Sequence, residues 1–408
     1  MKPFHIMAKP HGPICNLDCT YCYYLEKENL YSAGGGEFRM SDQVLEAYIR
    51  QYILSQPGEH VSFAWQGGEP TLLGIPFFER VLELQKKYAD GKIIENALQT
   101  NGTLIDDVWG EFLARNGFLT GLSIDGPEEL HDAYRVDKGG KPTFARVMRG
   151  LQMLKKHGVE FNTLTAVNRK NSYRPKDVYR FLKETGSKFL QFIPIVERVA
   201  NEPDSAGFVL IKPFTRQQAE VAEWSVEPLQ YGKFLAGVFD DWVRNDVGKT
   251  FVQAFDVALE SWANVPQSLC VFAPRCGAAM VVEHNGDLYS CDHFVYPENR
   301  LGNILEKNID RLAVTPLQTR FGNAKELGLP TDCRNCDVRF ACNGECPKHR
   351  FAKTASGESG LNYLCAGYKY FFHHIDPYMR FMANELSQNR APARVMEWAR
   401  SGAATTGW

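Results

Sequence analysis

The first half of the chain alternates short apolar runs with longer amphipathic stretches. The short runs are rich in β-branched and aromatic residues and predict six strands, at residues 4–9, 61–66, 93–100, 119–124, 160–167 and 189–195. The longer stretches repeat apolar positions at helical spacing and predict five helices, at residues 42–55, 76–88, 107–116, 143–157 and 175–185. This alternation predicts an α/β fold, a partial (β/α)6 TIM-like barrel over residues 1–200.

Polar segments that contain glycine directly follow three of these strands, at residues 66–70, 99–102 and 123–126. The carboxyl ends of parallel strands meet at one edge of a sheet, and barrel enzymes place their chemistry at that edge. We therefore expect the site there.

The alternation stops after residue 200. A loop at 201–207 and helical patterns near 217–222 and 230–246 predict a helical connector or insertion over residues 201–265. Residues 266–372 are rich in Cys, Gly and Asn, which predicts a small domain organised by bound metal rather than by an apolar core. Residues 377–388 predict a closing helix, within a C-terminal helix and tail at 373–408.

Length and charge narrow the possible partners. A chain of 408 residues exceeds the size at which one core usually stops growing, so more than one domain is expected. The net charge of −2 comes from 46 basic and 48 acidic side chains without a block of like charge, so no nucleic acid is expected as partner. No signal peptide and no run of about 18 apolar residues is evident, so we expect a cytoplasmic protein without membrane contact.

The 11 cysteines change this picture most. In a large chain without an export signal, clustered cysteines indicate metal or redox chemistry rather than disulfides. Three stand near the N-terminus and eight follow residue 269.

The N-terminal group consists of Cys15, Cys19 and Cys22, in the loop after the first predicted strand. A zinc site needs a fourth nearby ligand, whereas a [4Fe–4S] cluster on three thiolates keeps one iron open, able to chelate S-adenosylmethionine. The spacing, with aromatic Tyr21 before the third cysteine, resembles the signature of the radical S-adenosylmethionine superfamily. The alternatives are a zinc clip or buried free cysteines.

That resemblance implies further contacts with S-adenosylmethionine. The backbone at Gly68 would meet the methionine amino group, Ser123 the ribose and Arg135 the carboxylate, while Tyr21 and Val196 would face the adenine. The alternatives are a plain turn at Gly68, a strand-end cap at Ser123 and a solvated helix charge at Arg135.

The C-terminal eight cysteines make two sets of four, enough for two fully ligated [4Fe–4S] clusters. Their spacing resembles the SPASM domain, an auxiliary-cluster module. The resemblance implies an inner cluster on Cys270, Cys276, Cys291 and Cys346, and an outer one on Cys333, Cys336, Cys342 and Cys365. The chain would then carry three [4Fe–4S] clusters; the alternative is a pair of zinc-ribbon sites.

From residue 4 to about 390 the chain resembles the anaerobic sulfatase-maturating enzymes, most clearly at residues 8–10, 22–27, 289–294 and 342–348. The resemblance implies that a 5′-deoxyadenosyl radical abstracts hydrogen from the β-carbon of a Cys or Ser, which becomes formylglycine. Asp292 would be the general base, with a pKa raised toward neutrality by its buried place beside a cluster, and Tyr24 and Gln66 would lie near the substrate. The alternative for Asp292 is an ordinary surface or turn residue.

The resemblance also implies partners. These are an unfolded sulfatase polypeptide with a Cys/Ser-x-Pro-x-Arg motif, and an electron donor such as flavodoxin or ferredoxin. Two other functions stay open: a radical enzyme that crosslinks peptides, and a metal-binding scaffold without catalysis. The sequence does not decide between Cys and Ser as the target.

Overall fold

A ten-stranded sheet organises the computed structural model, which describes residues 3–31, 38–205, 207–213, 215 and 219–401. The strand order is β12-β11-β10-β1-β2-β3-β4-β5-β6-β9. Its centre consists of six parallel strands: β1 (His5–Lys9), β2 (His60–Trp65), β3 (Ile93–Thr100), β4 (Leu119–Ser123), β5 (Phe161–Val167) and β6 (Phe189–Pro194). These strands confirm the α/β fold class and the partial barrel.

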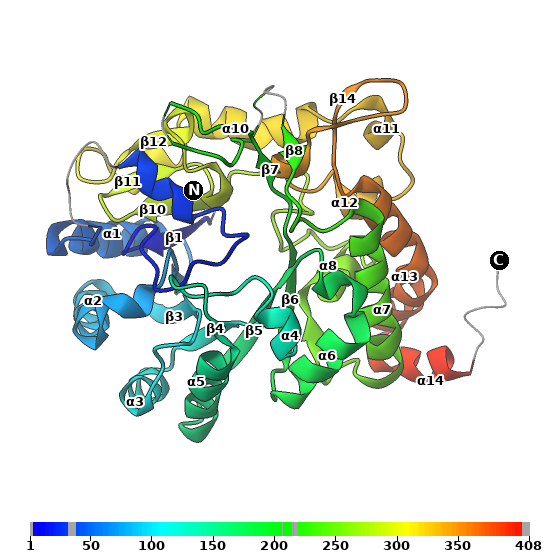
Figure 1. Cartoon of the computed structure of the whole chain (residues 1–408), viewed down its shortest axis with the longest axis horizontal. Coiled ribbons are helices and arrows are strands. Elements are labelled where there is room, and N and C mark those ends of the chain that lie inside the picture. The colour runs from blue at the N-terminus through cyan, green and yellow to red at the C-terminus, as the bar shows by residue number, and fades with distance from the viewer. Residues whose placement is uncertain (1–2, 32–37, 206, 214, 216–218, 402–408) are drawn as a thin grey trace.

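The predicted helices follow one another around the outer side of this sheet (Figure 1). They are α1 (Asp42–Ser55), α2 (Ile75–Tyr88), α3 (Asp107–Arg115), α5 (Phe144–Lys156) and α6 (Pro175–Glu184), with a short α4 (Glu128–His131) between β4 and α5. Side-chain caps fix two of their starts: Ser41 accepts the N–H of Val44 at 3.3 Å, and Asp106 accepts the N–H of Trp109 at 2.9 Å.

The sheet continues into the cysteine-rich region. Strand β10 (Ala279–Glu283) pairs in parallel with β1, and β11 (Asp287–Tyr289) and β12 (Arg300–Asn303) follow antiparallel. Val282 and Leu288 are fully buried in the same apolar core as the residues of β2. The expectation that this region lacks an apolar core is therefore wrong for β10–β12, because these strands cover the otherwise open edge of β1.

The connector is also part of the main body. Helices α7 (Pro228–Asn245) and α8 (Gln253–Trp262) pack with α13 (Cys365–Ser387) against β5 and β6 in one core, and β9 (Phe251–Val252) extends the sheet. Helix α7 crosses α13 so closely that a Cβ on Gly232 would lie 2.1 Å from the carbonyl oxygen of Gly367. Two glycines are thus required at this crossing.

The helix expected at 217–222 is wrong where the structure describes it. Strand β8 (Glu220–Val221) pairs antiparallel with β7 (Arg198–Val199), and the N–H of Ala222 donates to the carbonyl of Glu197 at 2.9 Å. Residues 217 and 218 lie outside the described residues. A six-residue stretch is too short to form a stable helix without a packed face, and here the backbone pairs with β7 and the adjoining Glu197 instead.

The remaining elements are the long helix α13 and a set of mostly shorter helices, strands and turns. The closing helix expected at 377–388 is the second half of α13, which begins at Cys365 and contains Pro377; α14 (Val395–Arg400) follows it. The others are helices α9 (Ile309–Leu312), α10 (Pro316–Leu327), α11 (Thr331–Arg334) and α12 (Arg339–Cys342), strands β13 (Ala352–Lys353) and β14 (Ser359–Leu361), and 3-10 turns at Leu25–Leu30, Pro70–Leu73, Asn171–Tyr173, Asp292–Phe294, Pro297–Asn299, Pro347–His349 and Pro392–Arg394. The domain limits at 200, 265 and 372 stay predictions. Within the described ranges, no helix has the length and apolar character needed to span a membrane.

Candidate active site

The loop that carries Cys15, Cys19 and Cys22 rests on the end of β2. The N–H of Gly68 donates to the carbonyl of Gly12 at 2.8 Å, and the next N–H, that of Glu69, donates to the carbonyl of Ile14 at 2.9 Å. A Cβ on Gly68 would lie 2.0 Å from the carbonyl oxygen of Ile14. Gly68 is therefore required by the close approach of the cysteine loop, whatever else its backbone contacts.

Glu69 fastens the ends of β2 and β3 together. Its fully buried carboxylate accepts hydrogen bonds from the hydroxyl of Thr71 at 2.6 Å, the hydroxyl of Thr100 at 2.8 Å and the N–H of Asn101 at 2.7 Å. The Asn101 amide in turn lies 3.8 Å from the Cys15 sulfur. Sequence reasoning missed Glu69 and Asn101, although both follow predicted strands.

Arg135 and Tyr21 meet at Asp125, a carboxylate directly after β4. The Arg135 guanidinium lies 3.0 Å from Asp125, and the Tyr21 hydroxyl donates to the same carboxylate at 2.5 Å. Arg135 is buried, so the alternative of a solvated helix charge is wrong. Ser123 accepts a hydrogen bond from the Gln99 amide at 3.0 Å.

Val196 is buried just after β6. None of these contacts tests the roles expected toward S-adenosylmethionine, which stay predictions.

All 11 cysteines are free thiols, and the thiols that influence one another's pKa fall into three groups. In the first set, burial raises the pKa of Cys19 to about 12, and Cys22 and Cys15 raise it further while Arg135 lowers it. Among the described residues, no three His, Cys, Asp or Glu side chains converge on the position of a single metal ion.

The C-terminal thiols that influence one another's pKa fall into two groups, and the cluster assignment implied by the resemblance stays a prediction. Burial, the Glu345 carboxylate and the neighbouring Cys276 and Cys270 raise the pKa of Cys346, and burial and Cys346 raise that of Cys291.

In the other set, burial raises the pKa of Cys333 to about 11, with Cys365 and Cys336 contributing, and burial, Cys365 and Cys333 act likewise on Cys342. Thiols with such raised pKa values become thiolate ligands only when a positive centre compensates their charge, which an iron–sulfur cluster does. The donor sets fit that group.

Asp292 lies between the first cysteine loop and the C-terminal cysteines. Its carboxylate forms an ion pair with Lys9 and accepts a hydrogen bond from the Tyr23 hydroxyl at 2.6 Å. Burial raises the pKa of Asp292, but Lys9, His293 and the Tyr23 hydroxyl outweigh it and lower the pKa to about 2. The expected rise toward neutrality is therefore wrong, because the sequence did not show that Lys9 would be its partner.

Lys9 also contacts Tyr24, the predicted substrate neighbour. The Lys9 ammonium lies 3.4 Å from the centre of the Tyr24 ring, and the Tyr24 hydroxyl donates to Glu283. Lys9 is only 1% exposed. Gln66 is half-buried at the end of β2, and its N–H donates to the carbonyl of Ala8 at 2.9 Å. Tyr24, Gln66 and Asp292 thus gather around the end of β1.

A second lysine, whose side chain is 10% exposed, connects this group to the segment after β6. Lys348 forms an ion pair with Glu197, and its ammonium lies 4.6 Å from the centre of the Tyr23 ring. His293 stacks on Tyr23 with ring centres 5.2 Å apart. Burial and Lys348 lower the pKa of His293 to about 3, although Asp292 raises it. Each lysine could have been noticed in the sequence. Lys9 is a charged residue at the end of an apolar strand, and Lys348 follows the cysteine Cys346 by two residues.

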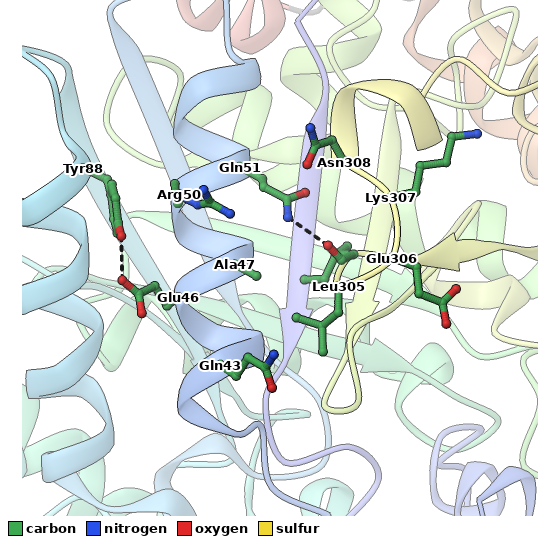
Figure 2. A pocket seen from close by; sticks show the side chains of 11 residues that line it. Gln43, Glu46, Ala47, Arg50, Gln51, Tyr88, Leu305, Glu306, Lys307 and Asn308 are labelled. Carbon is green, nitrogen blue, oxygen red and sulfur yellow. Dashed lines mark hydrogen bonds between the residues drawn. The ribbon is translucent and has the colours of Figure 1, made fainter.

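A separate hollow of about 450 Å³ lies between α1 and the segment after β12 (Figure 2). The buried Gln51 lines this hollow, and its side-chain amide donates to the carbonyl of Ile304 at 2.8 Å. Its lining contains no cysteine and none of the predicted site residues. The chemistry therefore belongs to the cysteine-lined end of the sheet.

Comparisons with known proteins agree with this geometry. The profile described as "Radical SAM superfamily" matches residues 9–182, and the profile described as "Iron-sulfur cluster-binding domain" matches residues 270–337. The two profiles cover the regions that hold the three-cysteine loop and most of the C-terminal cysteines.

Two curated relatives match nearly the whole chain. A serine-type anaerobic sulfatase-maturating enzyme of Bacteroides thetaiotaomicron is 49% identical over 98% of this chain and 96% of its own length. A cysteine-type anaerobic sulfatase-maturating enzyme of Clostridium perfringens is 36% identical over 95% of this chain and 100% of its own length. A solved structure of native anSMEcpe with bound AdoMet and Cp18Cys peptide superposes with a TM-score of 0.80, at 36% identity, covering 94% of this chain and 100% of that chain.

Replacing Gly68 by alanine is expected to displace the cysteine loop, since the added Cβ would collide with the Ile14 carbonyl. We predict that Gly68→Ala lowers the iron bound after anaerobic reconstitution, measured by iron analysis and visible absorption. Gly58→Ala is the matched control, because a Cβ there meets nothing within 4 Å. Equal iron content in the two variants would contradict the packing role given to Gly68.

Proposed function

This chain belongs to the anaerobic sulfatase-maturating enzymes, and we propose that it oxidises the β-carbon of a serine or cysteine in a sulfatase to formylglycine. The observation that carries this is the position of Asp292, a carboxylate held by Lys9 and Tyr23 between the three-cysteine loop and the inner cysteine set. A radical enzyme that makes an aldehyde needs a proton acceptor at that place.

Three [4Fe–4S] clusters are proposed. Cys15, Cys19 and Cys22 would hold the one that binds S-adenosylmethionine; Cys270, Cys276, Cys291 and Cys346 would hold the inner auxiliary cluster, and Cys333, Cys336, Cys342 and Cys365 the outer one. When bound, the first cluster would supply the electron that cleaves S-adenosylmethionine into methionine and the 5′-deoxyadenosyl radical, and the auxiliary clusters would supply a path for the second electron. The three sets of neighbouring thiols support this division.

Asp292 is proposed to take the proton that the substrate loses as its C=O or C=S bond forms. Lys9 and Tyr23 fix the carboxylate in place and keep it ionised, so it carries no proton before the substrate is oxidised. A thioaldehyde then exchanges sulfur for oxygen with water. Tyr24 and Gln66, which flank Lys9, are proposed to contact the substrate.

For S-adenosylmethionine, the proposed contacts are the backbone of Gly68, with Ser123, Arg135, Tyr21 and Val196 around the nucleoside and carboxylate. Arg135 already has Asp125 as partner, so its proposed contact uses the guanidinium donors that Asp125 leaves open. Arg135 and Asp125 also compensate each other's buried charge.

The substrate is proposed to be an unfolded sulfatase segment with a Ser/Cys-x-Pro-x-Arg motif, and the reductant a flavodoxin or ferredoxin. Support for a peptide comes from the peptide held by the related anSMEcpe. We propose serine as the preferred target, because the serine-type relative is 49% identical and the cysteine-type relative 36%.

The proposed function is tested by anaerobic incubation of the reconstituted protein with dithionite, S-adenosylmethionine and either of two peptides that differ only by Ser or Cys in this motif. We expect 5′-deoxyadenosine and, by mass spectrometry, loss of two hydrogens from the serine peptide. On the cysteine peptide the expected change is loss of sulfur and two hydrogens with gain of oxygen. Formation of 5′-deoxyadenosine with a thioether in the cysteine peptide would instead favour the crosslinking alternative.

Asp292→Asn removes the proton acceptor and retains its shape. We expect at least about 100-fold less formylglycine, the usual contribution of a general base, while 5′-deoxyadenosine still forms. Asp310→Asn, in the short helix α9, is the matched control and should keep full activity. Normal turnover by Asp292→Asn would show that Asp292 takes no part in the reaction.

A further inference from the structure

Arg350 donates hydrogen bonds to the short segment that links the two auxiliary thiol sets. That segment runs from Cys342, of the outer set, to Cys346, of the inner set. The Arg350 Nε donates to the carbonyl of Gly344 at 2.8 Å, and its Nη2 donates to the carbonyl of Asn343 at 2.8 Å and to that of Glu345 at 3.2 Å. The guanidinium, which stays charged in proteins, is thereby fixed between the two sets.

The charged groups that act on Arg350 also place it between the two thiol sets. Burial lowers the pKa of Arg350, and Glu345 and the thiols of Cys333, Cys342 and Cys276 favour its charged form. Two of these thiols belong to the outer set and one to the inner set. Arg350 therefore acts on both.

Lys325, in α10, is a second cation, on the side of the inner set. It is fully buried, and its ammonium donates to the carbonyls of Cys270 at 2.7 Å and Val271 at 2.8 Å. The thiols that act on it are Cys276 and Cys346, both of the inner set. Its charge thus bears mainly on one cluster.

Glu345 supplies the opposite charge in the same place. Its carboxylate, 2% exposed, accepts hydrogen bonds from His349 at 2.9 Å and from the Asn362 amide at 2.6 Å. The cations Arg350 and Lys325 exceed this one carboxylate, so the described charges between the thiol sets have a positive balance.

We propose that Arg350 and Lys325 are positioning residues that raise the reduction potentials of the auxiliary clusters, Arg350 for both and Lys325 for the inner one, so that they accept the electron of the substrate radical. The inference rests on the proposed function for the origin of that electron. A cluster on four thiolates is anionic, and one further electron adds negative charge in a buried site. Net charge around a cluster is one of the factors that set its potential.

The test is a redox titration followed by electron paramagnetic resonance. It uses the full reconstituted chain with Cys15, Cys19 and Cys22 replaced by alanine, so that only the auxiliary clusters give signals, and without peptide or S-adenosylmethionine. We expect Arg350→Gln to lower both midpoint potentials, Lys325→Met to lower one much more than the other, and Glu345→Gln to raise them. Arg350→Lys should return toward the parent values, and Lys307→Met, an exposed lysine at the hollow of Figure 2, should not change them.

Opposite signs for loss of a cation and loss of the carboxylate separate charge from simple damage to the fold. If Arg350→Gln or Lys325→Met does not load iron, Glu345→Gln decides, because it keeps the shape of the side chain. Unchanged potentials in Glu345→Gln, or shifts of the same sign in all variants, would overturn the inference. Shifts as expected in a protein that leaves both peptides unchanged would keep this inference and contradict only the proposed function.

Discussion

The parallel pairing of β1 with β10 is the contact on which the site depends. It places Lys9, the last residue of β1, opposite Glu283, the last residue of β10. A short hairpin then leads to Cys291 and Asp292, and Asp292 pairs with Lys9. The N-terminal cysteine loop leaves from the same strand end. One strand pairing thus joins the three-cysteine loop to Asp292 and Cys291.

Buried charge is the second common feature. Lys9, Lys348 and Lys325 are each largely removed from water and each faces a carboxylate or backbone carbonyls. Burying an ammonium is costly unless it is paired, so these contacts need a function that repays them. The functions we propose are orientation of Asp292, connection of the segment after β6 to the auxiliary region, and compensation of thiolate charge.

The sequence predicted what local pattern controls. The six strands, the outer helices and the barrel fold follow from periodicity, whereas the division of the C-terminal cysteines and the reaction came from the family resemblance. The partners of Asp292 were missed, since Lys9 lies more than 280 residues away in the chain and only the β1–β10 pairing brings the two together. For the same reason the sign of the pKa shift of Asp292 was wrong, and the short apolar run of β10 gave no hint that it extends the barrel sheet.

The central claim is that hydrogen leaves the β-carbon of the target residue and that Asp292 completes its oxidation. It is tested most directly with a serine peptide carrying deuterium only at the β-carbon, incubated with reconstituted protein and unlabelled S-adenosylmethionine. We expect 5′-deoxyadenosine to gain deuterium from the peptide in step with formylglycine. Unlabelled 5′-deoxyadenosine, formed while the peptide is modified at another carbon, would contradict it.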